Sequence, residues 1–219
     1  MAGCNNFSQP KTGFKLHSPS ASGIDFINLI EEDEHFNIMS YEYIYNGGGI
    51  AVEDFNKDGL PDLFFTGNMV SNRLYLNQGN FKFKDISETA GIRASDRWST
   101  GVAIADLNED GWPDIYVCAS TLKSEEKLAN MLFVHQGLNE DGIPTFIEMA
   151  DAYGIADKGF STNAAFLDYD RDNDLDLYVL TNRIETGSAD TYRRKRNQGN
   201  SPSNDRLYRN DGKGENGHP

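Results

Sequence analysis

The sequence predicts an all-β protein built from repeated antiparallel sheets, and three features predict it. An acidic nine-residue segment occurs three times, at residues 54–62, 106–114 and 168–176. Each copy lies between short runs of β-branched and aromatic residues, which are typical of strands. Glycine is frequent, with 21 residues in 219, as a fold rich in hairpins requires. We therefore expect each repeat to be a group of strands with the acidic segment as a connecting loop.

The acidic loop is predicted to join the first two strands of each repeat. The expected first strands are 48–52, 99–105 and 161–167, and the expected second strands are 63–66, 115–118 and 177–180. The second strands are almost continuously apolar, which indicates burial on both faces.

Two further strands complete the repeat. The expected third strands, 72–77, 130–135 and 205–210, alternate in polarity and end in glycine-containing hairpins. Fourth strands follow at 83–87 and 146–150. The first aspartates of successive loops are 52 and then 62 residues apart. Four strands in a repeat of about 40–60 residues are typical of a β-propeller blade.

The acidic loops are candidate metal sites because side-chain oxygens recur at loop positions 1, 3, 5 and 9. These side chains are Asp54, Asn56, Asp58 and Asp62; Asp106, Asn108, Asp110 and Asp114; and Asp168, Asp170, Asp172 and Asp176. Hard oxygen ligands at this spacing suit Ca²⁺, which accepts six to eight of them. A single copy could equally be an ordinary turn. Three copies in matching contexts favour metal binding, with up to three calcium ions.

Loop position 6 needs a residue that tolerates a positive φ, and it holds Gly59, Gly111 or Asn173. The loops differ from the helix–loop–helix calcium site. Position 12 holds Phe65, Val117 or Val179 in place of glutamate, and the flanks are strands.

Over residues 14–219 the chain resembles the FG-GAP/VCBS repeat family, the integrin-α-like calcium-loop propellers. Its strongest motifs are the three loops, residues 72–79 and residues 83–92. The nearest branch is that of bacterial secreted proteins and lipoproteins related to cartilage acidic protein. The resemblance implies about seven blades with calcium in many loops. It adds the position-7 carbonyls of Leu60, Trp112 and Asp174 to the ligands above. The third loop departs from the pattern at Asn173 and Asp174, where an extra carboxylate lies near the ion.

Blades are expected at about 48–92, 99–155 and 160–219, with the third ending after its third strand. A propeller closes with 4–8 blades, so we interpret the chain as an N-terminal fragment with two complete blades and a partial third. Residues 14–24 imitate the fourth-strand motif. We therefore expect residues 14–18 to form an orphan outer strand, although a chance match is the alternative.

The N-terminal residues 1–13 are expected to be a flexible tether. Ala-Gly-Cys4 resembles a bacterial lipobox without its preceding signal segment, so lipidation of Cys4 is the only membrane contact that we expect. Cys118 lies in an apolar strand and is expected to be an inert core thiol. No stretch approaches 18 apolar residues. The expected location is extracytoplasmic, as a bacterial outer-membrane lipoprotein or at the cell surface.

The net charge of −14 argues against nucleic acid as a partner, because phosphate binding needs a basic face. Three calcium ions would offset six of these charges. The one basic run, residues 193–196, is interpreted as a solvated loop.

We expect a non-enzymatic module that binds a protein or a glycan. None of the four histidines has metal-ligand spacing, and His17 and His135 are interpreted as surface residues on strand edges. Trp98 and Trp112 are candidates for a sugar platform, although packing against the next blade is favoured for Trp112. The alternative is the N-terminal part of a calcium-dependent, polysaccharide lyase-like enzyme.

Overall fold

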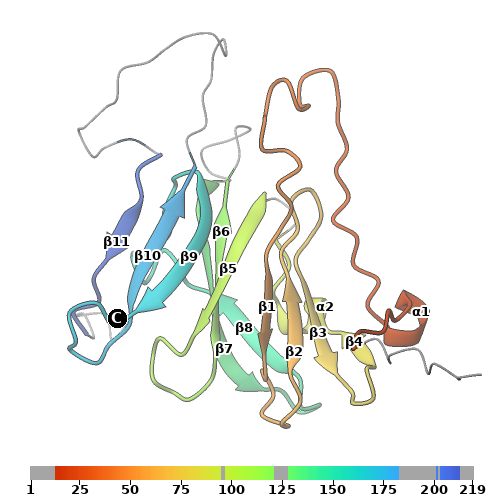
Figure 1. Ribbon diagram of the computed structural model, residues 1–219. Helices are drawn as coiled ribbons and strands as arrows, with labels where there is room; N and C mark the ends of the chain where they lie inside the picture. Colours follow the sequence, from red (N-terminus) through yellow and green to blue (C-terminus); the bar gives the residue numbers. More distant parts are fainter. Residues whose placement is uncertain (1–12, 95–96, 121–127, 183–200, 202, 213–219) are drawn as a thin grey trace, which may run out of the picture.

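The computed structural model describes residues 13–94, 97–120, 128–182, 201 and 203–212. Over these residues the chain forms three separate antiparallel sheets, and its helices are two single turns, α1 (Pro19–Ser22) and α2 (Ser87–Ala90). The sheets stand side by side, with the second sheet between the other two (Figure 1). The predicted all-β class is confirmed.

Each sheet follows the order of its strands in the chain. The first comprises β1 (Ile50–Glu53), β2 (Asp62–Phe65), β3 (Arg73–Asn77) and β4 (Phe83–Asp85). The second comprises β5 (Ser99–Ala105), β6 (Asp114–Ala119), β7 (Met131–Leu138) and β8 (Pro144–Glu148). The third comprises β9 (Ser161–Leu167), β10 (Asp176–Thr181) and β11 (Arg206–Tyr208). Within the described residues, all eleven strands lie at or close to the ranges that the sequence predicts.

The first strands of the three sheets are neighbours, with β5 between β1 and β9. The backbones of β5 and β9 approach closely at Gly101, where an added Cβ would lie 2.5 Å from the carbonyl oxygen of Thr162. The Thr100 hydroxyl donates to the carbonyl of Ser161 across the same gap at 2.8 Å. Three meanders that meet along their first strands have the arrangement expected of adjacent propeller blades.

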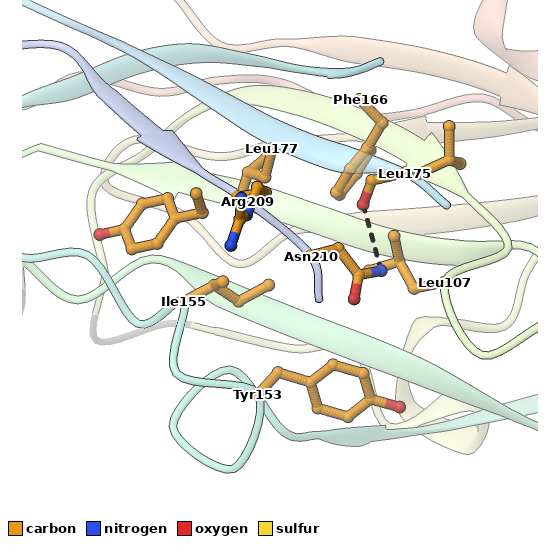
Figure 2. Close-up of a pocket in the computed structure, with 9 residues that line it drawn as sticks. Leu107, Tyr153, Ile155, Phe166, Leu175, Leu177, Arg209 and Asn210 are labelled. Carbon is orange, nitrogen blue, oxygen red and sulfur yellow. Dashed lines mark hydrogen bonds between the residues drawn. The ribbon is translucent and has the colours of Figure 1, made fainter. Parts of the chain in front are cut away.

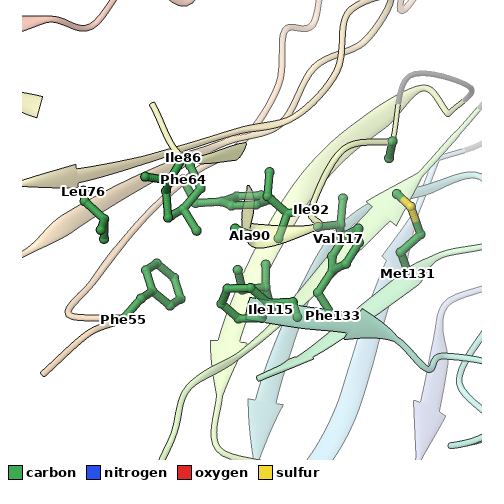
Figure 3. Close-up of a cluster of buried hydrophobic side chains, with 13 residues drawn as sticks. Phe55, Phe64, Leu76, Ile86, Ala90, Ile92, Ile115, Val117, Met131 and Phe133 are labelled. Atoms are coloured by element: carbon green, nitrogen blue, oxygen red, sulfur yellow. The ribbon is translucent and has the colours of Figure 1, made fainter. Parts of the chain in front are cut away.

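Apolar side chains fill the space between successive sheets. The cluster between the first and second sheets includes Phe55, Phe64 and Phe133 (Figure 3). Strand β6 is buried on both faces: Ile115 and Val117 belong to this cluster, whereas Tyr116 and Cys118 belong to the cluster shared with the third sheet. Cys118 is a free, fully buried thiol, as predicted, and burial raises its pKa.

Residues 14–18 have no partner strand among the described residues, as expected of an orphan strand, and the blade that they would complete stays a prediction. The side chains of Phe14 and Leu16 are 96% and 97% exposed. The segment leads into α1, whose cap Gly23 has a φ of 83° and packs on the backbone of Phe83.

Three predictions lie wholly or largely outside the described residues. They are the tether at residues 1–13, the lipidation of Cys4 and the solvated loop containing residues 193–196. Within the described residues, no helix is long and apolar enough to span a bilayer.

Candidate metal centre

Each acidic loop is folded around the aspartate at its first position. Asp54 accepts hydrogen bonds from the N–H groups of Asp58 at 3.1 Å and Gly59 at 2.8 Å. Asp106 accepts the corresponding bonds from Asp110 and Gly111 at 3.1 and 2.7 Å. In the third loop, Asp168 accepts from residues 171, 172 and 173. The sequence repeat is therefore a structural repeat, with the chain turned around one carboxylate.

The residues at loop position 6 adopt the left-handed conformation that the sequence predicts. Gly59, Gly111 and Asn173 have φ values of 85°, 84° and 77°. The sequence reasoning missed that position 4 is left-handed as well: Lys57, Glu109 and Arg171 have φ values of 57°, 58° and 67°. A positive φ is unusual for such residues and is held by surrounding bonds.

The aspartate at position 9 is buried and fastens the loop to two other segments. Asp62 Oδ2 accepts from the N–H of Phe55 at 3.0 Å, and its Oδ1 accepts from the N–H of Asn77 at 2.8 Å. Asp114 and Asp176 accept the equivalent pairs at 2.9–3.0 Å. One carboxylate thus joins the start of the loop to the end of the third strand. The sequence gives no sign of this link.

Burial raises the pKa of the Asp62 and Asp114 carboxyls to about 6. The backbone N–H donors oppose this rise, and the other carboxylates of the same loop add to it. Keeping these buried carboxylates ionised costs free energy, and a nearby cation would reduce that cost.

Position 3 distinguishes the third loop from the other two. Asn56 donates to Asp58 Oδ2 and Asn108 donates to Asp110 Oδ2, both at 3.0 Å. The third loop has Asp170 there, and its pKa is raised by desolvation and by the charges of Asp172 and Asp176. The third loop therefore holds like charges where the first two hold an amide–carboxylate pair.

Residues Asp168, Asp170 and Asp176 each present one oxygen, and these three oxygens lie within 4.8 Å of one another. Asp174, at position 7, adds a carboxyl whose pKa is raised to about 6 by its contact with the Asp172 side chain. Its Oδ1 is covered and has no hydrogen-bond partner. The three clustered oxygens fit a hard divalent cation such as Ca²⁺, and the unpartnered Asp174 oxygen belongs to the same loop.

The loop geometry brings the remaining predicted residues to the same turn. The N–H groups of Leu60, Trp112 and Asp174 donate to the position-5 carboxylates at 2.8, 2.7 and 3.3 Å. Position 7 is therefore folded back onto position 5 in all three loops.

The first two loops meet at a junction that the sequence reasoning did not find. His135, interpreted above as a surface residue, is 1% exposed, so that prediction is wrong. Its Nδ1 accepts from the N–H of Gly137 at 2.8 Å, which leaves the proton on Nε2, and Nε2 donates to the carbonyl of Phe55 at 3.0 Å. Burial lowers the pKa of His135, in keeping with a neutral ring.

Trp112 completes this junction. Its ring stacks on His135 with centroids 4.6 Å apart, and the Nζ of Lys57 lies 3.9 Å from its ring centroid. Trp112 therefore packs mainly against residues of its own sheet and the first loop. The other proposed platform, Trp98, is 6% exposed and meets the rings of Phe36 and Tyr41 edge-on, and it belongs to the lining of a cavity described below.

Comparison with known proteins agrees with this geometry. Residues 54–117 match the family model described as an FG-GAP-like repeat. The chain is 30% identical over 142 residues to cartilage acidic protein 1 of Mus musculus, which covers 61% of this chain and 20% of that protein. It is 38% identical over 72 residues to cartilage acidic protein 1 of Xenopus tropicalis, 32% of this chain and 11% of that protein. It is also 32% identical over 89 residues to integrin alpha-8 of Gallus gallus, 34% of this chain and 8% of that protein.

The predicted resemblance is thus confirmed for the repeat and for these relatives. The chain spans about a fifth or less of the length of the relatives that it matches.

Proposed function

We propose that this chain, which carries an FG-GAP-like repeat, is part of a calcium-binding β-propeller that acts as an extracellular binding module without catalysis. One observation carries the calcium assignment: three loops in three sheets share one carboxylate-centred hydrogen-bond framework. Each loop contains three to five aspartates and has few basic side chains to neutralise them. A divalent cation in each loop supplies the missing positive charge.

The residues proposed to hold the ion are the side chains at positions 1, 3, 5 and 9, with the position-7 carbonyl. The position-9 aspartate has a second role, because it already accepts two backbone N–H groups from separate segments. An ion bound to this carboxylate would therefore be tied to both the loop and the third strand. In this proposal calcium stabilises each sheet by holding its acidic loop against its third strand.

Calorimetry in chelator and in millimolar CaCl₂ tests this proposal. Ion binding at about 100 times the dissociation constant stabilises a fold by about 2.7 kcal/mol per site. We expect the melting temperature to rise with calcium, and Asp58→Ala to reduce the rise. Ser40→Ala, far from the loops in sequence, serves as the control. A melting temperature that does not respond to calcium would contradict the proposal.

For the ligand we propose a protein or a glycan. A cavity of about 440 Å³ opens at the ends of the first strands, lined among others by Tyr43, Thr100, Asn163 and Asn182. The residues described around it carry no charged side chain, which favours a neutral polar surface as the ligand. Glycan-array binding of the wild type and of Asn163→Ala tests whether the ligand is a glycan. Crosslinking to surface proteins tests whether it is a protein.

We propose an extracytoplasmic location, where millimolar calcium would fill loops of modest affinity. A lipid on Cys4 would anchor the chain to a membrane. Mass spectrometry of the protein from its native host tests this, and an unmodified Cys4 in a soluble protein would contradict it.

A further inference from the structure

The side chain at one aligned position, in or just after the third strand, differs among the three sheets. Asn77, His135 and Asn210 each donate their backbone N–H to the position-9 aspartate of their own loop. Asn77 and Asn210 also direct their side-chain amides to their own loops, to the carbonyls of Pro61 at 2.9 Å and Leu175 at 3.4 Å.

His135 directs its side chain to the neighbouring loop. Its Nε2–H donates to the carbonyl of Phe55, which is position 2 of the first loop, while its backbone N–H donates to Asp114 in the second loop. Phe55 is itself tied by its N–H to Asp62, the position-9 aspartate of the first loop. A chain of hydrogen bonds therefore runs from Asp62 through Phe55 and His135 to Asp114.

The ring has little freedom to absorb a movement of either loop. Trp112 stacks on one face of it, and the ring of Phe146 meets it edge-on with centroids 4.7 Å apart. Gly137 fixes its Nδ1, so the bond to Phe55 uses one tautomer in one orientation. Coupling between sites is carried by packed, hydrogen-bonded networks of this kind.

We propose that His135 couples the first two acidic loops, so that a cation bound in one raises the affinity of the other. The inference rests on the proposed calcium function and adds to it which loops act together. An ion that orders Asp62 fixes the Phe55 peptide, and His135 then holds Asp114 in place before the second ion arrives. His135 is a positioning residue, since it contacts no proposed ion directly. The third loop stands outside the pair because Asn210 bonds within its own loop.

Terbium luminescence tests the coupling, because Trp112 belongs to the second loop and sensitises an ion bound there. We expect Asp58→Ala, which disables the first loop, to weaken terbium binding at the second loop by about five- to tenfold. In a His135→Asn background, the same substitution should change that affinity by less than about twofold. The matched control is Asp172→Ala in the third loop, which should also change it by less than about twofold.

His135→Asn places at this position the residue found at 77 and 210, and its melting temperature in chelator shows whether it folds. If it does not fold, the reciprocal pair carries the test: Asp110→Ala must weaken calcium binding at the first loop by the same factor, because linkage is symmetric. An unchanged second-loop affinity in Asp58→Ala overturns the coupling and leaves calcium binding intact. A protein that binds neither Tb³⁺ nor Ca²⁺ at any loop overturns both the coupling and the proposed function.

Discussion

The junction between the first and second loops is packed and hydrogen-bonded, whereas the junction between the second and third loops is more open. At the first junction, Phe55, His135 and Phe146 are in mutual contact and His135 bonds across to Phe55. At the second, the residues equivalent to Phe55 and His135 are Leu107 and Asn210, and they line a cavity of about 60 Å³ (Figure 2).

One side chain contributes to this difference. Asn210 turns back to Leu175 of its own loop, so its side chain does not bridge the sheets. Equivalent repeats can thus form either a bridged or an unbridged contact, depending on the residue at this position.

The largest expected effect on the free energy of unfolding comes from removing the Phe55 ring at the first junction. Phe55 is fully buried, so Phe55→Ala should lower the free energy of unfolding by about 3–5 kcal/mol. Leu107→Ala, its counterpart beside the existing cavity, should cost about 2–3 kcal/mol, since fewer contacts are lost there. Urea unfolding in chelator measures both values. Equal losses would show that the two junctions are packed alike.

His135→Asn removes both the hydrogen bond to Phe55 and the ring that stacks on Trp112. In chelator we expect a loss of about 1–2 kcal/mol, because the Phe55 carbonyl loses its donor and the stacked ring is removed. Asn77→Ala is the control, since the Asn77 side chain bonds to Pro61 of the first loop and to Gly79 of the following hairpin, all within the first sheet's own repeat. A His135→Asn variant as stable as wild type would contradict the importance of the bridge.

The reverse exchange, Asn210→His, should tighten the second junction. An imidazole at this position would enter the cavity and reach toward the Leu107 carbonyl, as His135 reaches Phe55. We expect a gain of about 0.5–1 kcal/mol in urea unfolding. Asn210→Ala is the control that removes the native amide without adding a ring. A clear loss of stability would mean that the cavity cannot accept the ring.

The sequence predicted the regular parts of this comparison and missed the junctions. Strand positions and the left-handed Gly59, Gly111 and Asn173 follow from local pattern and backbone sterics, so they could be read from residue order. The burial of His135 depends on a loop 80 residues away that covers the end of β7. Alignment of the repeats does show a histidine where the others have asparagine, and that difference was the available signal.

The N-terminal segment shows the same limit. Residues 14–24 match the motif of residues 83–92, and the feature that both share in the structure is the turn, a four-residue helix followed by a left-handed Gly23 or Gly91. Strand β4, before the second turn, pairs with β3, whereas residues 14–18 have no partner among the described residues. Local sequence therefore determined the turn, and the outer strand at residues 14–18 stays a prediction.

The smallest expected effect concerns Lys57, whose ammonium lies over the Trp112 ring and adds a cation–π contact to the first junction. Lys57 is exposed, so Lys57→Ala should cost only about 0.5 kcal/mol in urea unfolding. Because residue 57 has a positive φ, the substitution by alanine also changes backbone strain. Glu109→Ala measures that strain effect in the second loop. Glu109 occupies the same loop position with a φ of 58° and, as an anion, makes no cation–π contact. The difference between the two variants isolates the contact with Trp112. If Lys57→Ala is no more destabilising than Glu109→Ala, the first junction is held by the His135 bridge and its aromatic packing alone.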